Sequence, residues 1–215
     1  ESKYDSDGNL LSDYGVSRTI YKYDSNGNMV GRSNYDSDGS LKNNIIYKYN
    51  SNGNVVGQSG YDSDGSLKYK IIYKYDSNGN VVEGSDYKSD GSLDSKTIFK
   101  YDSKGNMVDQ SNYKSDGSLE GKYINKWDSK GNMVEMLEYD SDSLSSKTIS
   151  KHDSKGNEVE SLSENYSEDY PNWKVIGKYN TKNRRVEEIL YDQKFKFGKL
   201  QEKPIRKTIY EYEEY

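Results

Sequence analysis

Residues 41–61 read LKNNIIYKYNSNGNVVGQSGY, and this stretch decides the fold. Two short runs rich in Ile, Val and Tyr flank the segment NSNGN, and runs bounded by Asn, Ser and Gly in this way are typical of β-hairpins. Gly53 has no Cβ and takes a positive φ at little cost. If the turn is of type I with Gly53 in the left-handed position, Tyr49 pairs with Val55 and Lys48 with Val56.

The hairpin recurs along the chain with a period of 26 residues. The first turn of each unit follows an aromatic anchor, at Tyr23, Tyr49, Tyr75, Tyr101 and Trp127. The second turn, with sequences such as DSDGS or KSDGS, follows Tyr35, Tyr61, Tyr87, Tyr113 and Tyr139. A fixed period of this length indicates an array of small structural units, here of two strands each.

The composition favours strands. The 215 residues include 23 Tyr and 19 Gly, only 2 Pro, and no Cys or Ala, which argues against helices. Leu, Ile, Val and Phe make up about 17% of the chain, below the roughly 20% at which a charged chain is usually disordered. The net charge of -5 is small for this length and the apolar residues are periodic, so we predict a folded, tyrosine-rich layer.

We predict an all-β fold, an antiparallel β-hairpin repeat array of about 15–16 strands that forms a long, twisted or curled meander sheet. Regular repeats cover about residues 4–160, degenerate capping repeats cover about residues 161–215, and residues 1–215 form a single domain. Pro171 and Pro204 lie outside the regular units, as expected if the repeat strands need their N–H groups for the sheet. The pattern is compatible with an open, a rolled or a two-layered sheet.

Alternation of side chains divides the sheet into two faces. We name them the aromatic face, which carries Tyr47, Tyr69 and Tyr73, and the lysine face, which carries Lys48, Lys70 and Lys74. With Tyr61 paired to Leu67, the aromatic face is predicted to include Ile45, Tyr47, Tyr49, Val55, Tyr61, Leu67, Tyr69, Ile71, Tyr73 and Tyr75. The lysine face is predicted to include Lys48, Gln58, Lys68, Lys70 and Lys74, with Ile46, Val56 and Ile72.

An aliphatic stripe recurs on the lysine face. It consists of Ile20, Ile46, Ile72, Ile98, Ile124 and Ile149 beside Val30, Val56, Val82, Val108, Val134 and Val159. A solvated face does not need an Ile at the same place six times, so we expect both faces to be partly covered, by curling of the sheet or by another segment. A one-residue error in the turn would exchange the faces.

The turn aspartates of DSDGN and DSDGS invite a calcium interpretation. A calcium loop of the EF-hand kind spaces its oxygen ligands D-x-D-x-D-G and adds a Glu beyond the Gly, whereas here Gly is fourth and no such Glu recurs. Asp also begins tight turns by accepting a bond from the backbone two residues on. We therefore predict turn chemistry and no metal site. Asn183 stands where the next turn glycine is expected, because Asn is the next best residue at positive φ.

We predict no catalytic residue and no cofactor. His152 is the only histidine and takes the place of an aromatic anchor, so we interpret it as a substituted ring. The chain has no Cys and no G-x-S-x-G elbow for nucleophilic catalysis. Glu187 and Glu188 are adjacent, so on a strand they point to opposite faces and do not flank one glycosidic bond.

The charge pattern and hydropathy exclude two kinds of partner. Lysines alternate with acidic residues instead of forming a basic run, which gives no support to nucleic-acid binding. No stretch approaches the roughly 18 apolar residues of a membrane span, and no signal-peptide pattern is present. Because an anchor-like residue, Tyr4, follows Glu1 so closely, we expect an upstream signal or anchor segment to have been removed.

The aromatic ladder is the binding candidate. Tyr beside Asn and Lys can stack on sugar rings or contact a protein, because it offers a large area at low entropic cost. The alternative is that most rings replace a missing aliphatic core. The predicted binding residues are Tyr47, Tyr49, Tyr73, Tyr75, Tyr101 and Trp127.

The strings YKYDSNGN, YKYNSNGN and YDSDGS resemble the YD repeats of Rhs-type bacterial surface and toxin proteins, whose signature is Tyr-Asp followed by a Gly-Asn turn. They are also similar to the tandem YDxxGN/YxSDGSL proteins common in Bacteroidetes. The likeness covers about Tyr4 to Asn157. It implies β-hairpins in a long curling sheet and an extracellular or cell-envelope role in binding or encapsulation. The chain has no recognisable core protease or toxin segment, unlike true Rhs proteins.

Three functions are therefore considered. The first is a non-enzymatic, exported, cell-surface module that binds a glycan or another surface protein. The second is a purely structural spacer, and the third is a glycoside-active enzyme, which would need converging carboxylates in a cleft. The sequence favours the first and leaves the oligomeric state open.

Overall fold

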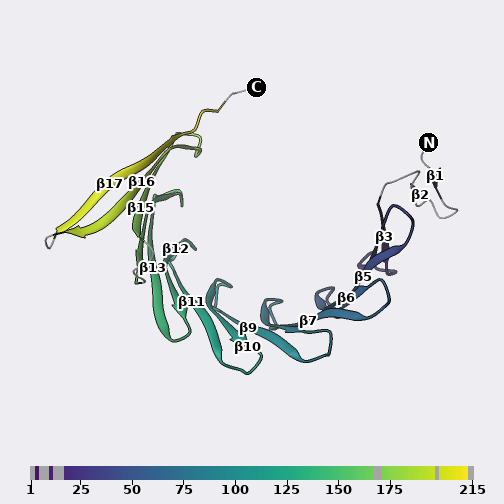
Figure 1. The fold of residues 1–215 in the computed structure, drawn as a ribbon. Coiled ribbons are helices and arrows are strands. Elements are labelled where there is room, and N and C mark those ends of the chain that lie inside the picture. The colour runs from purple at the N-terminus through teal and green to yellow at the C-terminus, as the bar shows by residue number, and fades with distance from the viewer. Residues whose placement is uncertain (1–2, 5–9, 12–16, 167–170, 197–198, 213–215) are drawn as a thin grey trace. The chain divides into compact units, whose positions relative to one another are not determined.

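The computed structural model describes residues 3–4, 10–11, 17–166, 171–196 and 199–212. Fifteen strands, β3 to β17, form one open antiparallel sheet whose strand order follows the sequence (Figure 1). Strands β1 and β2 pair in a separate two-stranded sheet. These residues contain no helix, and so none that is long and apolar enough to cross a membrane. The predicted all-β hairpin meander is confirmed, and the sheet is open.

The strands of the main sheet range from 6 residues in β3 to 12 residues in β16. Their bounds are β1 Lys3–Tyr4, β2 Leu10–Leu11, β3 Arg18–Tyr23, β4 Met29–Tyr35, β5 Leu41–Tyr49, β6 Val55–Asp62, β7 Leu67–Tyr75, β8 Val81–Tyr87, β9 Leu93–Tyr101, β10 Met107–Lys114, β11 Leu119–Trp127, β12 Met133–Asp140, β13 Ser143–His152, β14 Glu158–Asn165, β15 Asn172–Tyr179, β16 Arg185–Lys196 and β17 Lys199–Ile209. Pro204 lies in β17, the last strand of the sheet, where a missing N–H costs least.

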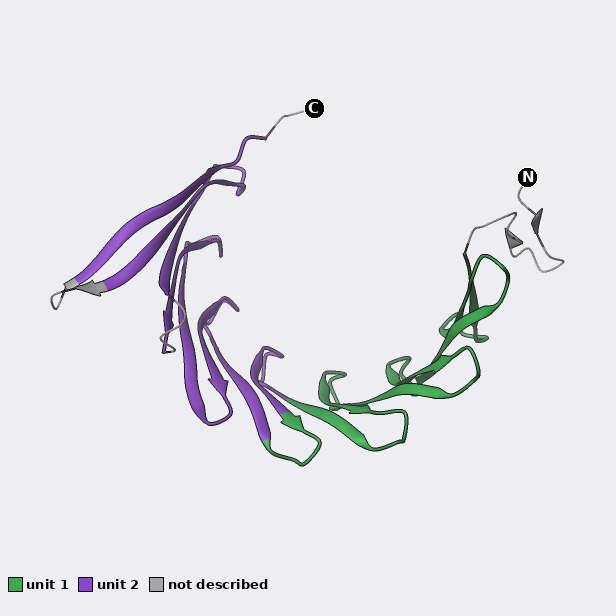
Figure 2. Cartoon of the chain, viewed as in Figure 1, with its two compact units in different colours: residues 1–98, 113–118 green, residues 99–112, 119–215 purple. Residues whose placement is uncertain are grey.

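The chain divides into two compact units (Figure 2). Unit 1 comprises residues 1–98 and 113–118, and unit 2 comprises residues 99–112 and 119–215. Within the described part of each unit, extensive contacts join strands that are consecutive in the sequence. The prediction of a single domain stays a prediction.

The turns have the predicted backbone chemistry. In the hairpin of β5 and β6, the N–H of Gly53 donates to the carbonyl of Asn50 at 3.1 Å, and Gly53 has φ 80°. Asn183 takes the same role with φ 65°, which confirms that the repeat continues past residue 160. In the repeat that lacks a turn glycine after Asp140, Ser141 takes the positive φ, at 52°. The turn predicted for DSDGN, which is residues 5–9 and contains Gly8, lies outside the described residues.

The register confirms two predicted pairs and corrects a third. Tyr49 pairs with Val55, as predicted, but Lys48 pairs with Gly57 and not with Val56, because a β-bulge separates the two pairs. At the next turn Tyr61 pairs with Leu67, as predicted, and a second register shift follows between Gly60 and Tyr61.

These bulges exchange the faces of two residues on β6. Gln58 pairs with Tyr47 and its amide donates to the Tyr69 hydroxyl at 2.9 Å, so Gln58 lies on the aromatic face. Tyr61 pairs with Asn44, which shares its face with Ile46 and the lysines. The predicted positions of Tyr61 and Gln58 are therefore wrong, since one extra residue per bulge reverses the alternation of the rest of the strand.

No hydrophobic side chain is buried among the described residues. The buried side chains are polar, namely Ser85, Asp109, Ser111, Asn125, Ser146, Ser150, Ser161, Ser163 and Gln193. Ile46 of the aliphatic stripe is 38% exposed. The other residues of the stripe are half-buried, and the expectation that curling of the sheet or another segment partly covers it stays a prediction. In place of the buried hydrophobic core of other proteins, contacts between side chains on neighbouring strands stabilise this sheet.

The turn geometry predicts that Gly53→Ala destabilises the protein by about 1 kcal/mol, since an L-residue at this positive φ is strained. Gly57→Ala is the matched control on β6, because a Cβ there meets only ordinary contacts at 3.7 Å. Thermal denaturation followed by circular dichroism measures both. Equal midpoints for the two variants would contradict the assignment of Gly53 to a strained turn.

Candidate binding surfaces

In five repeats the first aromatic anchor donates a hydrogen bond to the backbone of the strand before it, and we call this contact the anchor clamp. The hydroxyl of Tyr75, the last residue of β7, donates to the carbonyl of Val55, the first residue of β6, at 2.6 Å. The ladder between these strands ends at the pair of Gly57 with Ile72, so the Val55 carbonyl lies beyond it. The ring thus supplies a donor to a backbone acceptor that the sheet leaves unpaired.

This anchor clamp recurs along the chain. The donors and carbonyl acceptors are Tyr49 and Met29 (2.8 Å), Tyr75 and Val55 (2.6 Å), Trp127 and Met107 (2.9 Å), Tyr179 and Glu158 (3.1 Å), and Tyr212 and Arg185 (2.8 Å). Three of the six predicted binding residues, Tyr49, Tyr75 and Trp127, therefore use their polar atoms to hold the sheet. Tyr101 also takes part in an interaction.

Tyr47 and Tyr73 differ from the anchors. No hydrogen bond of either hydroxyl is found among the described residues, and both rings are half-buried on the aromatic face of unit 1. Burial raises the pKa of the Tyr73 hydroxyl, and the carboxylate of Asp86 adds to the effect. These two predicted residues therefore differ from Tyr49, Tyr75 and Trp127, whose polar atoms are bonded to the backbone.

Glycines make room for rings on the aromatic face. A Cβ built on Gly60 would lie 2.3 Å from Cε1 of Tyr69, so this ring lies directly over the backbone of β6. Gly84 pairs with Tyr73, and a Cβ there would be 3.8 Å from the Tyr73 ring. The rings therefore lie low against the sheet instead of standing upright.

The lysine face carries a ladder of ion pairs that the sequence analysis missed. A lysine at the end of one strand faces an acid nine positions later, across the turn, on the next strand. The pairs are Lys74–Glu83 (2.8 Å), Lys100–Asp109 (3.4 Å), Lys126–Glu135 (2.7 Å), Lys151–Glu160 (2.7 Å) and Lys178–Glu187 (2.6 Å). The recurrence of Lys and an acid at this spacing is a signal that could have revealed the ladder.

In three repeats the second aromatic anchor lies on the lysine face beneath a cation. Arg18 lies over the Tyr35 ring at 4.7 Å, and Lys70 over the Tyr87 ring at 5.7 Å. Lys96 has the same relation to Tyr113. Such contacts attract the cation to the negative face of the ring. At Tyr61 the residue across the strand is Asn44, which carries no charge.

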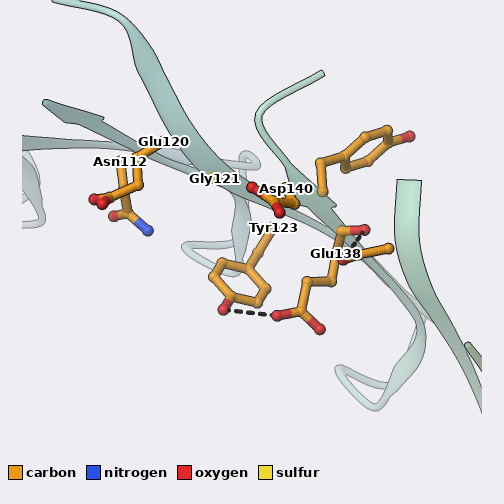
Figure 3. Close-up of a pocket in the computed structure, with 8 residues that line it drawn as sticks. Asn112, Glu120, Gly121, Tyr123, Glu138 and Asp140 are labelled. Atoms are coloured by element: carbon orange, nitrogen blue, oxygen red, sulfur yellow. Dashed lines mark hydrogen bonds between the residues drawn. The ribbon is translucent and has the colours of Figure 1, made fainter. Parts of the chain in front are cut away.

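Unit 2 contains a hollow of about 410 Å³ beside β11 and β12 (Figure 3). Tyr123 and Glu138 point toward each other there, and the tyrosine hydroxyl donates to Oε1 of Glu138 at 3.1 Å, which raises the pKa of Tyr123. Ser146 donates to Oε2 of Glu138 at 2.9 Å. Both oxygens of this carboxylate are therefore engaged. No group of residues that could hold a metal ion occurs in the described part of the chain.

The turn aspartates use their carboxylates within the turn, as predicted. Oδ1 of Asp76 accepts from the backbone N–H groups of Asn78 and Asn80, each at 2.9 Å, and Oδ2 accepts from the Asn80 amide at 3.0 Å. The bond from the Asn80 side chain, followed by that from its backbone, holds the pKa of Asp76 below its ordinary value. At one turn Asn50 replaces the aspartate and accepts the same two backbone bonds.

The other chemical candidates, His152 and the pair Glu187 and Glu188, lie on strands of the sheet. His152 ends β13 in the anchor position, and its Nδ1 is buried without a partner among the described residues. Glu187 pairs with Lys178 and Lys207, whereas Glu188 pairs with arginines. The two adjacent carboxylates thus serve separate ion pairs.

No protein-family model and no curated protein matches this chain. Among solved structures, it is similar to a porin-like protein from Bacteroides uniformis, with 10% identity, 90% of each chain covered and a TM-score of 0.45. It is also similar to a protein of unknown function from Bacteroides fragilis, with 11% identity, 90% of this chain and 93% of that chain covered, and a TM-score of 0.16. A third is the Tc holotoxin pore of Photorhabdus luminescens, with 12% identity, 94% of this chain but 15% of that chain covered, and a TM-score of 0.22. Likenesses at these scores carry no argument about function, and the YD-repeat resemblance stays a prediction.

The anchor clamp predicts that Tyr75→Phe destabilises unit 1 by about 1 kcal/mol, because the Val55 carbonyl loses its donor. Tyr73→Phe is the matched control on the same strand, since its hydroxyl has no described partner. Urea denaturation followed by circular dichroism compares the two variants. If Tyr73→Phe costs as much as Tyr75→Phe, the clamp is not the stabilising contact.

The turn aspartates also predict the acid dependence of stability. Their pKa values in the folded state lie below the ordinary 3.8, as for Asp76, so their contribution is complete above that value and is lost as the pH falls below it. We expect a constant melting temperature at neutral pH that declines below about pH 4. The Asp76→Asn variant keeps the two backbone bonds that Asn50 accepts at its own turn, so we expect its melting temperature to fall less below pH 4 than that of the native protein. An equal or steeper decline would contradict the assignment.

Proposed function

We propose that this chain is a non-enzymatic, exported repeat protein that binds a glycan at the cell surface through the aromatic face of unit 1. The observation that carries the proposal is the pair Tyr47 and Tyr73. They lie one repeat apart, their rings are half-buried, and their hydroxyls have no partner among the described residues.

The surroundings of these two rings suit a sugar chain. β5 and β7 are two strands apart, a distance of roughly 10 Å, so one extended ligand can contact both rings. Gln58 faces Tyr47 and offers an amide beside it. A tyrosine that lies low on a sheet presents a flat apolar surface with a polar rim, which matches the C–H face and the hydroxyls of a pyranose.

The exposure of the rings on the open sheet also supports a binding role. No hydrophobic side chain is buried in the described residues, so the rings keep part of their surface for contact with another molecule. The proposal therefore includes an extracellular or cell-envelope location for this chain.

A purely structural spacer is the second candidate. It is favoured by the anchor clamps, since Tyr49, Tyr75 and Trp127 use their polar atoms on the backbone. A spacer needs stiffness along the array and no ligand. A glycoside-active enzyme has no observation in its favour, because the adjacent carboxylates of Glu187 and Glu188 serve separate ion pairs.

The proposal predicts that Tyr47→Ala with Tyr73→Ala abolishes binding to the glycan that the native protein selects on a glycan array. Loss of two stacking rings is expected to weaken binding by at least tenfold, measured by isothermal titration. Tyr49→Phe is the control, because it keeps the ring and removes only a clamp bond. An array with no bound glycan, or an alanine pair that lowers the melting temperature without changing affinity, would leave the spacer as the better account. Selective capture of a protein instead would also overturn the proposal.

A further inference from the structure

The lysine face of unit 1 departs from the ion-pair ladder in the first two described repeats. At the register position where Glu83 faces Lys74, Gly31 faces Lys22 and Gly57 faces Lys48. No ion pair of Lys22 or Lys48 is found among the described residues, and both are exposed. Two ammonium groups thus lack the acid that every later repeat supplies.

The surrounding strands have the same bias of charge. Strands β3 to β7 carry eight basic residues, which are Arg18, Lys22, Arg32, Lys42, Lys48, Lys68, Lys70 and Lys74, and one acidic residue, Asp62. Arg32 lies on the aromatic face, since it pairs with Tyr21 and Ile45. On the lysine face Lys42, Lys68 and Lys74 pair with Asp36, Asp62 and Glu83. For the other four basic residues of this face, Arg18, Lys22, Lys48 and Lys70, no ion pair is found among the described residues, although the whole chain has a net charge of -5.

One row of paired residues across the strands connects Lys22 with a third lysine, Lys70. Successive pairs connect Lys22, Gly31, Ile46, Ser59 and Lys70 from β3 to β7. Ile46 is 38% exposed in the middle of this row. Four strand spacings separate the end lysines, roughly 19 Å, and Lys48 lies between them on β5. We name Lys22, Lys48 and Lys70, with Ile46, the basic strip.

We propose that the basic strip binds an acidic polysaccharide whose uronate carboxylates take the place of the missing glutamates. In later repeats the same lysine position holds a carboxylate at 2.6–3.4 Å, so the site for that group is already present on the strand. A chain of uronates offers carboxylates at regular intervals across several strands. The exposed Ile46 side chain receives the C–H face of a sugar ring.

Other polyanions fit this surface less well. An extended peptide binds a sheet by adding a strand at its edge, and a sheet face has no free backbone groups to offer it. Nucleic acids bound without sequence preference stack bases on open aromatic rings, whereas Arg18 and Lys70 already lie over Tyr35 and Tyr87. The basic strip lies on the face opposite Tyr47 and Tyr73, so the inference does not depend on the proposed function.

The glycines supply the sharpest variant. A Cβ on Gly31 or Gly57 meets only ordinary contacts of 3.6–3.7 Å, including Cβ of the facing lysine, and neither glycine has a positive φ. Gly31→Glu with Gly57→Glu therefore rebuilds the ion pair of later repeats and neutralises two lysines of the strip. The fold is expected to persist. The control is Gly31→Gln with Gly57→Gln, which adds the same bulk without charge.

The experiment is isothermal titration of the native chain and its variants with oligogalacturonate at low salt. We expect the double Glu variant to bind about tenfold more weakly than the native chain, the double Gln variant to bind within about threefold of it, and added salt to weaken binding. Glu83→Gly, which frees Lys74, is expected to strengthen binding. Fully methyl-esterified oligogalacturonate, with the same backbone and no charge, is expected not to bind.

Four results would overturn the inference. They are no binding of oligogalacturonate, equal binding of its methyl ester, equal or tighter binding of poly-L-glutamate or single-stranded DNA, and equal losses in the Glu and Gln variants. If the double Glu variant does not fold, Lys22→Gln with Lys48→Gln replaces it with the same expected loss. Tyr47→Ala with Tyr73→Ala is expected to leave uronate binding unchanged, which separates this inference from the proposed function.

Discussion

The structure depends on the bond from an anchor ring to a backbone carbonyl of the strand before it. A sheet without a buried hydrophobic side chain in its described part must hold neighbouring strands together by other means. The Tyr75 hydroxyl reaches the Val55 carbonyl beyond the end of the ladder, and Trp127 does the same for Met107 with its indole N–H. Because the donor differs and the acceptor position is constant, the contact explains why either aromatic residue serves at this place in the repeat.

This way of building a sheet leaves both faces available. Each hairpin is stabilised by its neighbours, as expected for a repeat array, so neither face needs a second layer. On the aromatic face the hydroxyls of Tyr47 and Tyr73 have no hydrogen-bond partner in the described part of the chain, and on the lysine face Gly31 and Gly57 interrupt the ion-pair ladder. Because no hydrophobic side chain is buried in the described residues, both faces of the sheet stay accessible, and the two faces differ in chemistry.

Much of the fold could be predicted from the sequence. The turn glycines, the role of Asn183 and the pair of Tyr49 with Val55 follow from local backbone chemistry. The faces of Tyr61 and Gln58 could not, because the bulge after the turn falls at Val56, between residues that are both apolar and give no alternation signal. The roles of the six candidate rings could not be separated from the sequence either, since only the structure shows which ring donors reach a carbonyl.

The central claim is that stability is local, held by anchor clamps between neighbouring strands. Amide hydrogen exchange, followed by mass spectrometry in the native chain and in Tyr75→Phe, tests it most directly. The account predicts faster exchange in β6 and β7 and unchanged exchange in β14 to β16. A uniform increase along the whole chain would contradict it, because that result requires one cooperative core.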